Sequence, residues 1–255
     1  MNSELAALQP TKRFSNRVEN YVRYRPSYPG DIVPFLEANL KLKQEHCVAD
    51  IGSGTGLFAE ILLKKGYDVI CIEPNEEMRR AAEKKLNQYT GFTSRNDSAE
   101  QTGLPGHSVD LITVAQAFHW LNTFAAKKEF ERILKPGGHI VIAYNLRLTN
   151  TPFLKEYDEL KKQFAIEINI NNRPGKDSLE NFFQPYPMNT ASFSNIQWLD
   201  FDALKGQLLS ASYIPLPGHP TYDTMISSLV QLFVAFNENG FIKMQYETKL
   251  YWCKS

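Results

Sequence analysis

Two carboxylates and a run of glycines are the residues whose types and spacing could do chemistry in this sequence. The stretch V-A-D-I-G-S-G-T-G at positions 48–56 places Asp50 two residues before the first of three glycines. Glycines at every second position allow a tight turn and have no β-carbon that would keep a ligand away from the backbone. A carboxylate beside such a turn suits a ligand with a cationic amine, because opposite charges attract. The residues that would face this ligand are Asp50, Gly52, Ser53, Gly54 and Gly56.

Two phosphate-binding motifs that use similar turns are absent at this place. The dinucleotide motif G-x-G-x-x-G would need its third glycine at position 57, where the sequence has Leu57. The phosphate loop of nucleoside triphosphatases needs a lysine followed by Ser or Thr, and the turn contains no lysine. A ligand held by its pyrophosphate is therefore disfavoured. An NAD-dependent oxidoreductase is a further alternative, which detectable binding of NADH would support.

The second carboxylate follows at a spacing that suits ribose binding. Glu73 lies 21 residues after Gly52 and ends a short apolar stretch that predicts a strand at positions 69–73. A carboxylate at the tip of the second strand of such a unit can accept hydrogen bonds from ribose hydroxyl groups. Asp50 and Glu73 together predict a pocket for a ligand that has both a ribose and an amine.

A regular alternation of strands and helices would position these residues. Apolar stretches predict five strands, at positions 47–51, 69–73, 91–95, 109–115 and 139–144. Helical spacing predicts the intervening helices at 57–65, 75–89 and 123–134. Five strands that alternate with helices define a parallel sheet with right-handed crossovers. Ligands of such sheets bind at the carboxyl ends of the strands, so both carboxylates should lie at one edge.

Three separate motifs together resemble the class I S-adenosylmethionine-dependent methyltransferases. They are the glycine-rich stretch at 48–56, Glu73, and the sequence L-K-P-G-G at 134–138. The sequences Y-R-P-S-Y-P at 24–29 and A-F-H-W at 117–120 also resemble the small-molecule type 11 methyltransferases similar to trans-aconitate methyltransferase. The resemblance implies an α/β, Rossmann-like fold with a seven-stranded mixed sheet, mostly parallel with the last strand antiparallel, and S-adenosyl-L-methionine as cofactor.

The resemblance also implies one methyltransferase domain over residues 1–255. Residues 1–40 would form an N-terminal lid and helix, and residues 41–147 the cofactor-binding core. Residues 148–240 would form a cap that binds the substrate. Residues 241–255 alternate apolar and polar side chains, which suits a final edge strand.

Further cofactor-binding residues follow from the resemblance alone. Asp50 and the glycine turn would orient the methionine portion and Glu73 the ribose, whereas Asp97 would accept from the adenine amine. Asp97 could equally be a helix cap, and Met78 could be a core residue. The remaining residues that the resemblance places around the cofactor are Pro74, Met78, Ser98, Ala99, Gln116 and Ala117.

Candidate acceptor-binding residues come from three places in the chain. Tyr21, Tyr24, Arg25 and Tyr28 would line the pocket if the N-terminal segment is a lid, and would only cover the core if it is not. Arg25, Arg147 and Arg173 are candidate clamps for a carboxylate, because guanidinium pairs with it bidentately, or else ordinary surface residues.

A histidine and a tryptophan follow the fourth predicted strand directly. His119 and Trp120 would face the acceptor, and His119 is the candidate catalytic base for a hydroxyl or amine acceptor. A lone histidine is also often a structural residue, so both roles stay open. A carboxylate acceptor would need no base, because it is already anionic near neutral pH.

Composition limits the partners. The chain has 28 Lys and Arg against 28 Asp and Glu, so no global field draws it to nucleic acid or anionic lipid. We find neither a signal peptide nor an apolar run of membrane-spanning length. Three cysteines form no disulfide framework, which favours reduced thiols and a cytoplasmic location. We expect no metal, and the oligomeric state is not predicted.

These observations lead to one hypothesis and one alternative. The hypothesis is methyl transfer from S-adenosylmethionine to a small molecule, at the oxygen of an organic-acid carboxylate or a hydroxyl group. The alternative is a non-catalytic protein that binds S-adenosylmethionine or S-adenosylhomocysteine on the same fold.

Overall fold

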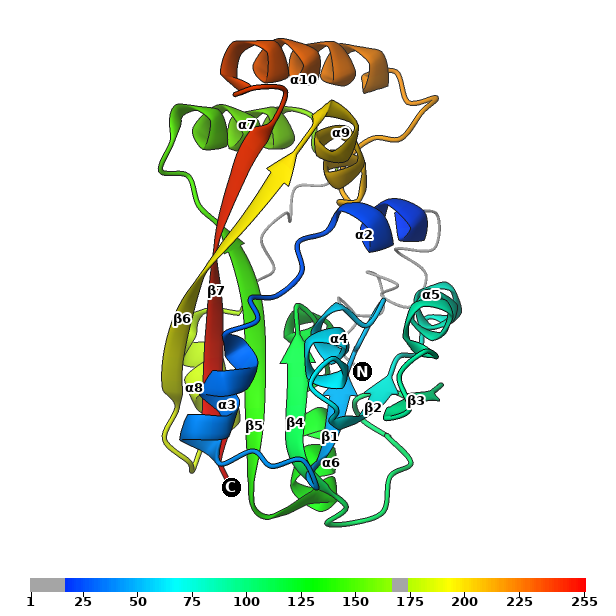
Figure 1. Cartoon of the computed structure of the whole chain (residues 1–255), viewed down its shortest axis with the longest axis vertical. Coiled ribbons are helices and arrows are strands. Elements are labelled where there is room, and N and C mark those ends of the chain that lie inside the picture. The colour runs from blue at the N-terminus through cyan, green and yellow to red at the C-terminus, as the bar shows by residue number, and fades with distance from the viewer. Residues whose placement is uncertain (1–16, 167–173) are drawn as a thin grey trace.

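The computed structural model describes residues 17–166 and 174–255. Its strands form one seven-stranded mixed sheet in the order β3-β2-β1-β4-β5-β7-β6 (Figure 1). The pairs among β1 to β5 are parallel, and β7 pairs antiparallel with both β5 and β6. The predicted fold class is thereby confirmed. The strands are β1 (Cys47–Ile51), β2 (Asp68–Ile72), β3 (Phe92–Arg95), β4 (Val109–Ala115), β5 (Leu134–Arg147), β6 (Asn189–Leu199) and β7 (Ile242–Lys254).

Helices cover both faces of this sheet and build a separate layer beyond one end of it (Figure 1). None of the described helices is long and apolar enough to span a membrane. The helices are α2 (Val18–Tyr24), α3 (Ile32–Leu40), α4 (Leu57–Leu63), α5 (Glu76–Leu86), the short 3-10 helix η2 (Phe118–Trp120), α6 (Thr123–Ile133), α7 (Pro152–Gln163), α8 (Lys176–Phe183), α9 (Phe201–Leu209) and α10 (Tyr222–Phe236).

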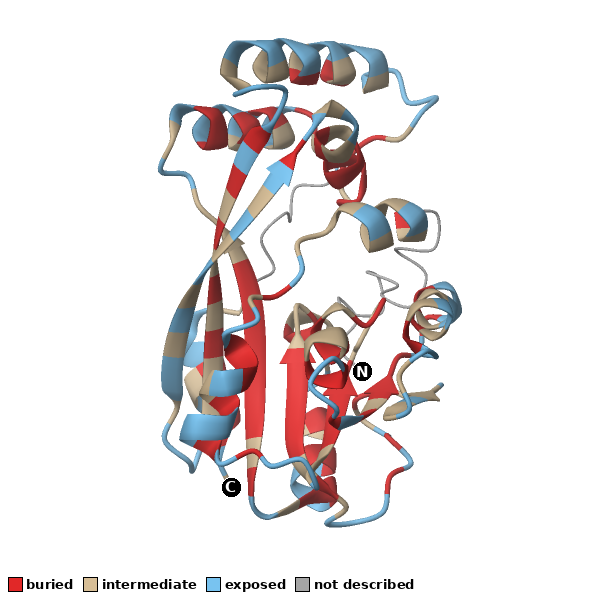
Figure 2. Ribbon diagram, in the orientation of Figure 1, coloured by how far each residue is buried: buried red, intermediate tan, exposed pale blue. Residues whose placement is uncertain are grey.

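Two apolar clusters fix the helices on the two faces of the sheet. One face carries α3, α4 and α5, with Leu36 and Leu62 fully buried against the strands. The other face carries α6 and α8, where Phe130 packs edge-on against Phe182. Burial of each such side chain contributes about 1.5–3 kcal/mol, so these faces hold the strand ends in place. Figure 2 shows the buried residues concentrated in the central strands.

A third cluster forms the layer beyond the sheet. Helices α7, α9 and α10 pack around the outer ends of β6 and β7, which continue past the other strands as a two-stranded ribbon (Figure 1). Leu204, Leu208 and Met244 are fully buried there. Asp200 caps α9 by accepting a hydrogen bond from the Ala203 amide at 2.8 Å. We call this layer the cap. It contains α7, α9 and α10 from the region 148–240 that we predicted as a cap, whereas α8 and β6 of that region belong to the sheet and its covering face.

One part of the predicted organisation is wrong. Residues 241–255 do not form an edge strand, because β7 lies between β5 and β6 and the edge is β6. Alternation along β7 reflects one buried face and one partly exposed face, which an interior antiparallel strand also has. The sequence pattern therefore could not distinguish an edge position from an interior one.

Candidate active site

The glycine turn and the tip of β2 lie together at the carboxyl edge of the sheet. Strands β1 and β2 pair in register, with Ile51 opposite Ile72. The Gly52 amide donates to the Ile72 carbonyl at 2.8 Å, and the Gly54 amide donates to Glu73 Oε2 at 2.8 Å. The two strand ends predicted to share a site are therefore joined directly.

The three glycines of the turn have three different surroundings, although all have positive φ. A Cβ on Gly52 would lie 2.7 Å from Ala117 Cβ, and one on Gly56 would lie 2.3 Å from Leu86 Cδ1. A Cβ on Gly54 would meet nothing within 4 Å. Gly52 and Gly56 are thus required by packing, whereas Gly54 leaves its backbone open to a ligand.

Asp50 is a fully buried carboxyl group beneath this turn. Its Oδ1 accepts a hydrogen bond from Thr113 Oγ1 at 2.6 Å, and its Oδ2 is buried without a hydrogen-bond partner. Burial raises the pKa of Asp50 to about 7, against the opposing effects of the Thr113 bond and of the Ala59 backbone amide. A cation bound nearby would therefore stabilise the ionised form of Asp50. Thr113 was missed from sequence, although a hydroxyl residue in the apolar second half of β4 was a signal for it.

Glu73 occupies the end of β2 and accepts from two backbone amides. Oε2 binds the Gly54 amide and Oε1 binds the Asn75 amide, both at 2.8 Å. Burial raises the pKa of Glu73, while these two bonds lower it. Each oxygen retains a further acceptor position, so hydroxyl groups of a ligand can still be bound. Asn75 then caps α5 by accepting from the Met78 amide at 2.9 Å, which places the exposed Pro74 and the buried Met78 beside Glu73.

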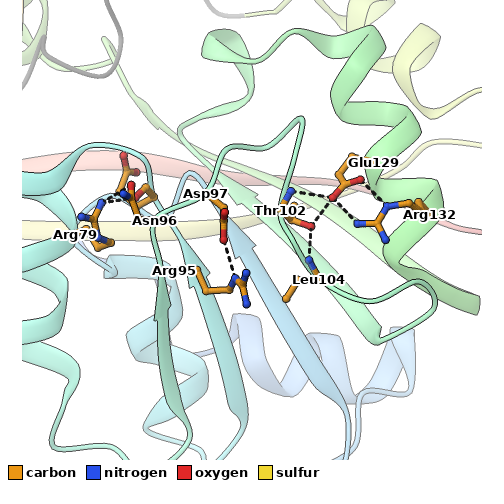
Figure 3. A network of polar contacts seen from close by, with 9 residues as sticks. Arg79, Arg95, Asn96, Asp97, Thr102, Leu104, Glu129 and Arg132 are labelled. Carbon is orange, nitrogen blue, oxygen red and sulfur yellow. Dashed lines mark hydrogen bonds and ion pairs between the residues drawn. The ribbon is translucent and has the colours of Figure 1, made fainter.

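The segment after β3 is held by a polar network that the sequence did not reveal (Figure 3). Arg95 Nε donates to Asp97 Oδ2 at 2.8 Å, so Asp97 is paired within the protein. Ser98 forms a β-bridge with Gln101, and Ala99 is buried.

The same network fastens this segment to α6. Glu129 Oε1 accepts from the amide and the hydroxyl of Thr102 at 2.8 and 2.6 Å, and Arg132 donates to both carboxylate oxygens. The Arg132 guanidinium and the Thr102 bonds lower the pKa of Glu129 to about 2. A fixed loop therefore carries Asp97, Ser98 and Ala99 beside the β2 tip.

The end of β4 brings the next candidates to the same edge. Gln116 has a φ of 57° and donates from Nε2 to the Asn145 carbonyl at 3.2 Å. Ala117 is buried against the position of Gly52. His119 Nδ1 lies 3.3 Å from Tyr144 Oη, and its ring centroid lies 4.6 Å from that of Trp120. His119 and Trp120 are both partly buried, and Tyr144 was not among the predicted residues.

The N-terminal candidates divide between the cap and the core. The Tyr24 ring packs on α9, where a Cβ on Gly206 would lie 2.1 Å from it. The Tyr28 ring is buried in the core, 4.9 Å from that of Phe58. Arg25 lies 4.9 Å from the centroid of Tyr21 and donates to the Ser210 carbonyl at 3.1 Å. Of the lid and helix predicted for residues 1–40, residues 1–16 lie outside the described residues.

Arg25 and Arg147 both lie near the buried side chains of Tyr157 and Tyr246. Arg147 pairs with Asp158 at 2.5 Å, and its carbon Cζ lies 5.1 Å from the Tyr157 ring centroid. Burial raises the pKa of Tyr157 and raises that of Tyr246 to about 12, and the charges of Arg147 and Arg25 lower both. The Nε atoms of both arginines are buried without a hydrogen-bond partner. Arg173, the third candidate clamp, lies outside the described residues.

Comparison with known proteins agrees with this arrangement. A family model described as a methyltransferase domain matches residues 49–142. An uncharacterized methyltransferase of Mycobacterium bovis is 30% identical over 203 residues, which cover 78% of this chain and 76% of that protein.

Solved structures share the fold at low sequence identity. A candidate type II methyltransferase of Anaeromyxobacter dehalogenans superposes with a TM-score of 0.64 and 20% identity, covering 91% of this chain and 97% of that one. Phosphoethanolamine N-methyltransferase 2 of Haemonchus contortus, solved in complex with S-adenosyl-L-methionine, has a TM-score of 0.59 and 15% identity, covering 100% of this chain and 60% of that one. The chain therefore belongs to the class I S-adenosylmethionine-dependent methyltransferases.

Proposed function

We propose that this protein binds S-adenosyl-L-methionine and methylates an oxygen atom of a small organic acid, at a carboxylate or a hydroxyl group. The observation that carries the cofactor assignment is the junction of Asp50, Gly54 and Glu73 at one sheet edge. Gly54 leaves space for a ligand, Asp50 has a buried acceptor without a partner, and Glu73 can accept further hydrogen bonds.

These groups fit the parts of the cofactor. The buried Asp50 favours a nearby ammonium, and the Glu73 carboxylate suits a ribose diol. Asp97, Ser98 and Ala99 would contact the adenine, and the Asp97 carboxylate retains acceptor positions besides the one that Arg95 uses. Pro74 and Met78 flank the same place, and Gln116 and Ala117 support the methionine portion. S-adenosylmethionine supplies an already activated methyl group, so the protein contributes orientation and electrostatics.

The acceptor assignment rests on charge. Among residues 17–166 and 174–255, no carboxylate forms an ion pair with Arg25, and the buried Nε of Arg25 lacks a partner. Arg147 is already neutralised by Asp158. Arg25 is partly buried, so a carboxylate on the acceptor would pair with its guanidinium and offset the cost of removing this charge from water. Arg25 and Arg147 would hold the acceptor, with Tyr21 stacked on Arg25 and Tyr24 fixing its helix to the cap.

A hydroxyl acceptor would place the chemistry at His119. Its Nδ1 is within reach of the buried Tyr144 hydroxyl, which can fix the orientation of the ring. Trp120 packs beside it. His119 would then accept the proton of the acceptor, whereas a carboxylate would leave it as a lining residue only.

The remaining assignments follow from this function. We propose one domain, with residues 1–40 and the cap at 148–240 closing over the core at 41–147, and membership of the subgroup similar to trans-aconitate methyltransferase. The acceptor is a small molecule rather than a nucleic acid or a membrane component, which the zero net charge supports. The protein would act in the cytoplasm.

Calorimetry with S-adenosylhomocysteine tests the cofactor assignment. Glu73→Ala should weaken binding by about 1–3 kcal/mol, because charged hydrogen bonds are lost. Glu76→Gln is a matched control, since Glu76 is an exposed carboxylate only three residues away. No heat with the wild-type protein at high micromolar ligand would refute the assignment.

Transfer of a labelled methyl group tests the reaction. The wild-type protein, incubated with methyl-labelled S-adenosylmethionine and a pool of small organic acids, should give a labelled product. Alkali would hydrolyse this product if a carboxylate was methylated to an ester and would leave it intact if a hydroxyl group was methylated to an ether. Tight cofactor binding without labelled product from any acid, alcohol or amine pool would instead favour a non-catalytic binding protein.

A further inference from the structure

Helix α2 is fastened to the cap by its N-cap residue, Arg17. The Arg17 side chain is buried and donates three hydrogen bonds to carbonyls that follow the C-terminal end of α9 or belong to it. They run from Nη1 to Leu209 O at 2.8 Å and Ala211 O at 2.8 Å, and from Nη2 to Ile214 O at 2.6 Å. Leu209 is the last residue of α9, and carbonyls at a helix C-terminus have no partner within the helix and carry partial negative charge, so the Arg17 guanidinium stabilises this end of α9.

The same helix is held along its length. Arg25, one residue past its end, donates to the Ser210 carbonyl at 3.1 Å, between the carbonyls that Arg17 binds. The Tyr24 ring lies on Gly206, where any side chain would collide with it. Gln197 Nε2 donates to the Tyr24 carbonyl at 3.1 Å. Helix α2 is therefore an extension of the cap and not an independent arm.

The opposite side of α2 reaches the proposed cofactor site. Helix α2 lies against α5, whose first turn follows Glu73 (Figure 1). Four residues after its end, Tyr28 is buried in the core, close enough to Asp50 and Tyr21 for both to raise its pKa, after burial itself. The helix thus bridges the cap and the edge of the sheet that carries Asp50 and Glu73.

From this bridge we propose that Arg17 is a positioning residue, which holds α2 on α9 and so sets the place of Tyr21 and Arg25 over the bound cofactor and acceptor. The inference rests on the proposed function, because α2 can retain a cofactor only if one binds at Asp50 and Glu73. Arg17 itself would contact neither the cofactor nor the acceptor. Its loss should free α2 from the cap while leaving the sheet intact.

The test compares Arg17→Gln with Arg23→Gln, which makes the same chemical change at an exposed arginine of the same helix. The first measurement is the dissociation rate of S-adenosylhomocysteine by stopped-flow fluorescence. The second is hydrogen exchange of the amides at 18–24 in the ligand-free protein. Arg17→Gln should raise the dissociation rate about tenfold and accelerate this exchange to a similar degree, because the three hydrogen bonds from the charged guanidinium are lost. Arg23→Gln should change neither, and Arg17→Lys should restore part of both.

A second variant separates the release of α2 from a general loss of folding in Arg17→Gln. Gly206→Ala keeps Arg17 and strengthens the propensity of α9, yet its Cβ displaces the Tyr24 ring and should free α2 in the same way. A merely structural Arg17 would lower the melting temperature without changing the dissociation rate. Unchanged dissociation and exchange in Arg17→Gln and Gly206→Ala would overturn the proposal. Wild-type protein that binds no S-adenosylhomocysteine would refute the proposed function instead, and exchange at 18–24 would still decide whether Arg17 holds the helix.

Discussion

The buried carboxyl of Asp50 should make cofactor binding depend on pH. Its pKa is raised to about 7 by burial, and a bound ammonium group would lower it again because it favours the ionised form. Binding then requires the loss of a proton from Asp50 below about pH 7. The affinity for S-adenosylhomocysteine should rise with pH and level off above the pKa.

The size of this effect follows from the position of the pKa. At about pH 6 only about one Asp50 in ten is ionised, whereas at about pH 8 nearly all are, so the dissociation constant should fall roughly tenfold between them. Calorimetry in two buffers of different ionisation enthalpy should also show about one proton released per ligand at the lower pH. The Thr113 hydroxyl can still bond the amide oxygen in Asp50→Asn, so this variant should fold.

The Asp50→Asn variant tests whether the titration of Asp50 causes this pH dependence. It should bind more weakly than wild type at about pH 8 and show no pH dependence across this range, because its side chain does not titrate. The free energy of unfolding of the variant should also depend on pH differently from that of the wild type. A carboxyl with a raised pKa in the folded state binds its proton more tightly there than in the unfolded chain, so wild-type stability falls relative to the variant as pH rises from about 4 to about 7. A flat affinity in wild type, or an equal slope in the variant, would refute the reasoning.

Three further predictions concern the turn, the network and the acceptor site. Gly56→Ala should lower the free energy of unfolding by about 1–3 kcal/mol in chemical denaturation, because its Cβ would overlap Leu86 at a positive φ; an unchanged value would contradict the packing account. Glu129→Gln should lower the melting temperature at neutral pH, because the carboxylate has a pKa lowered to about 2, and the difference from wild type should vanish as pH falls from about 4.5 through about 2; a difference that persists in acid would count against the ion pair. Arg25→Lys should reduce the rate of labelled methyl transfer to organic acids by about tenfold at subsaturating acceptor while leaving S-adenosylhomocysteine affinity unchanged, since bidentate pairing is lost; full activity would exclude Arg25 as the clamp.

The core of the fold could be predicted because its signals are local. Strand β1, the glycine turn and the Glu73 spacing each depend on a few consecutive residues, and they came out as predicted. The boundaries of β4 were also correct, since a central apolar strand gives a strong pattern. Helix ends elsewhere moved by one to a few residues, as for α4, which ends at Leu63.

The candidate site was predictable only where one segment presents its own residues. Glu129 lies far along the chain from Thr102, and their contact depends on how α6 packs, which no sequence spacing encodes. Tyr24 and Tyr28 belong to one aromatic segment, yet one packs on the cap and the other in the core. Tyr157 and Tyr246 come from α7 and β7 and meet the two arginines only through the fold of the cap. Long-range packing therefore explains most of what the sequence could not reveal.

A crystal structure of the protein with S-adenosylhomocysteine would test the central claim most directly. The account predicts the ribose hydroxyl groups within hydrogen-bond distance of the Glu73 carboxylate and the homocysteine backbone over Gly54, above the buried Asp50. A ligand bound elsewhere, with Glu73 still accepting only the amides of Gly54 and Asn75, would contradict it.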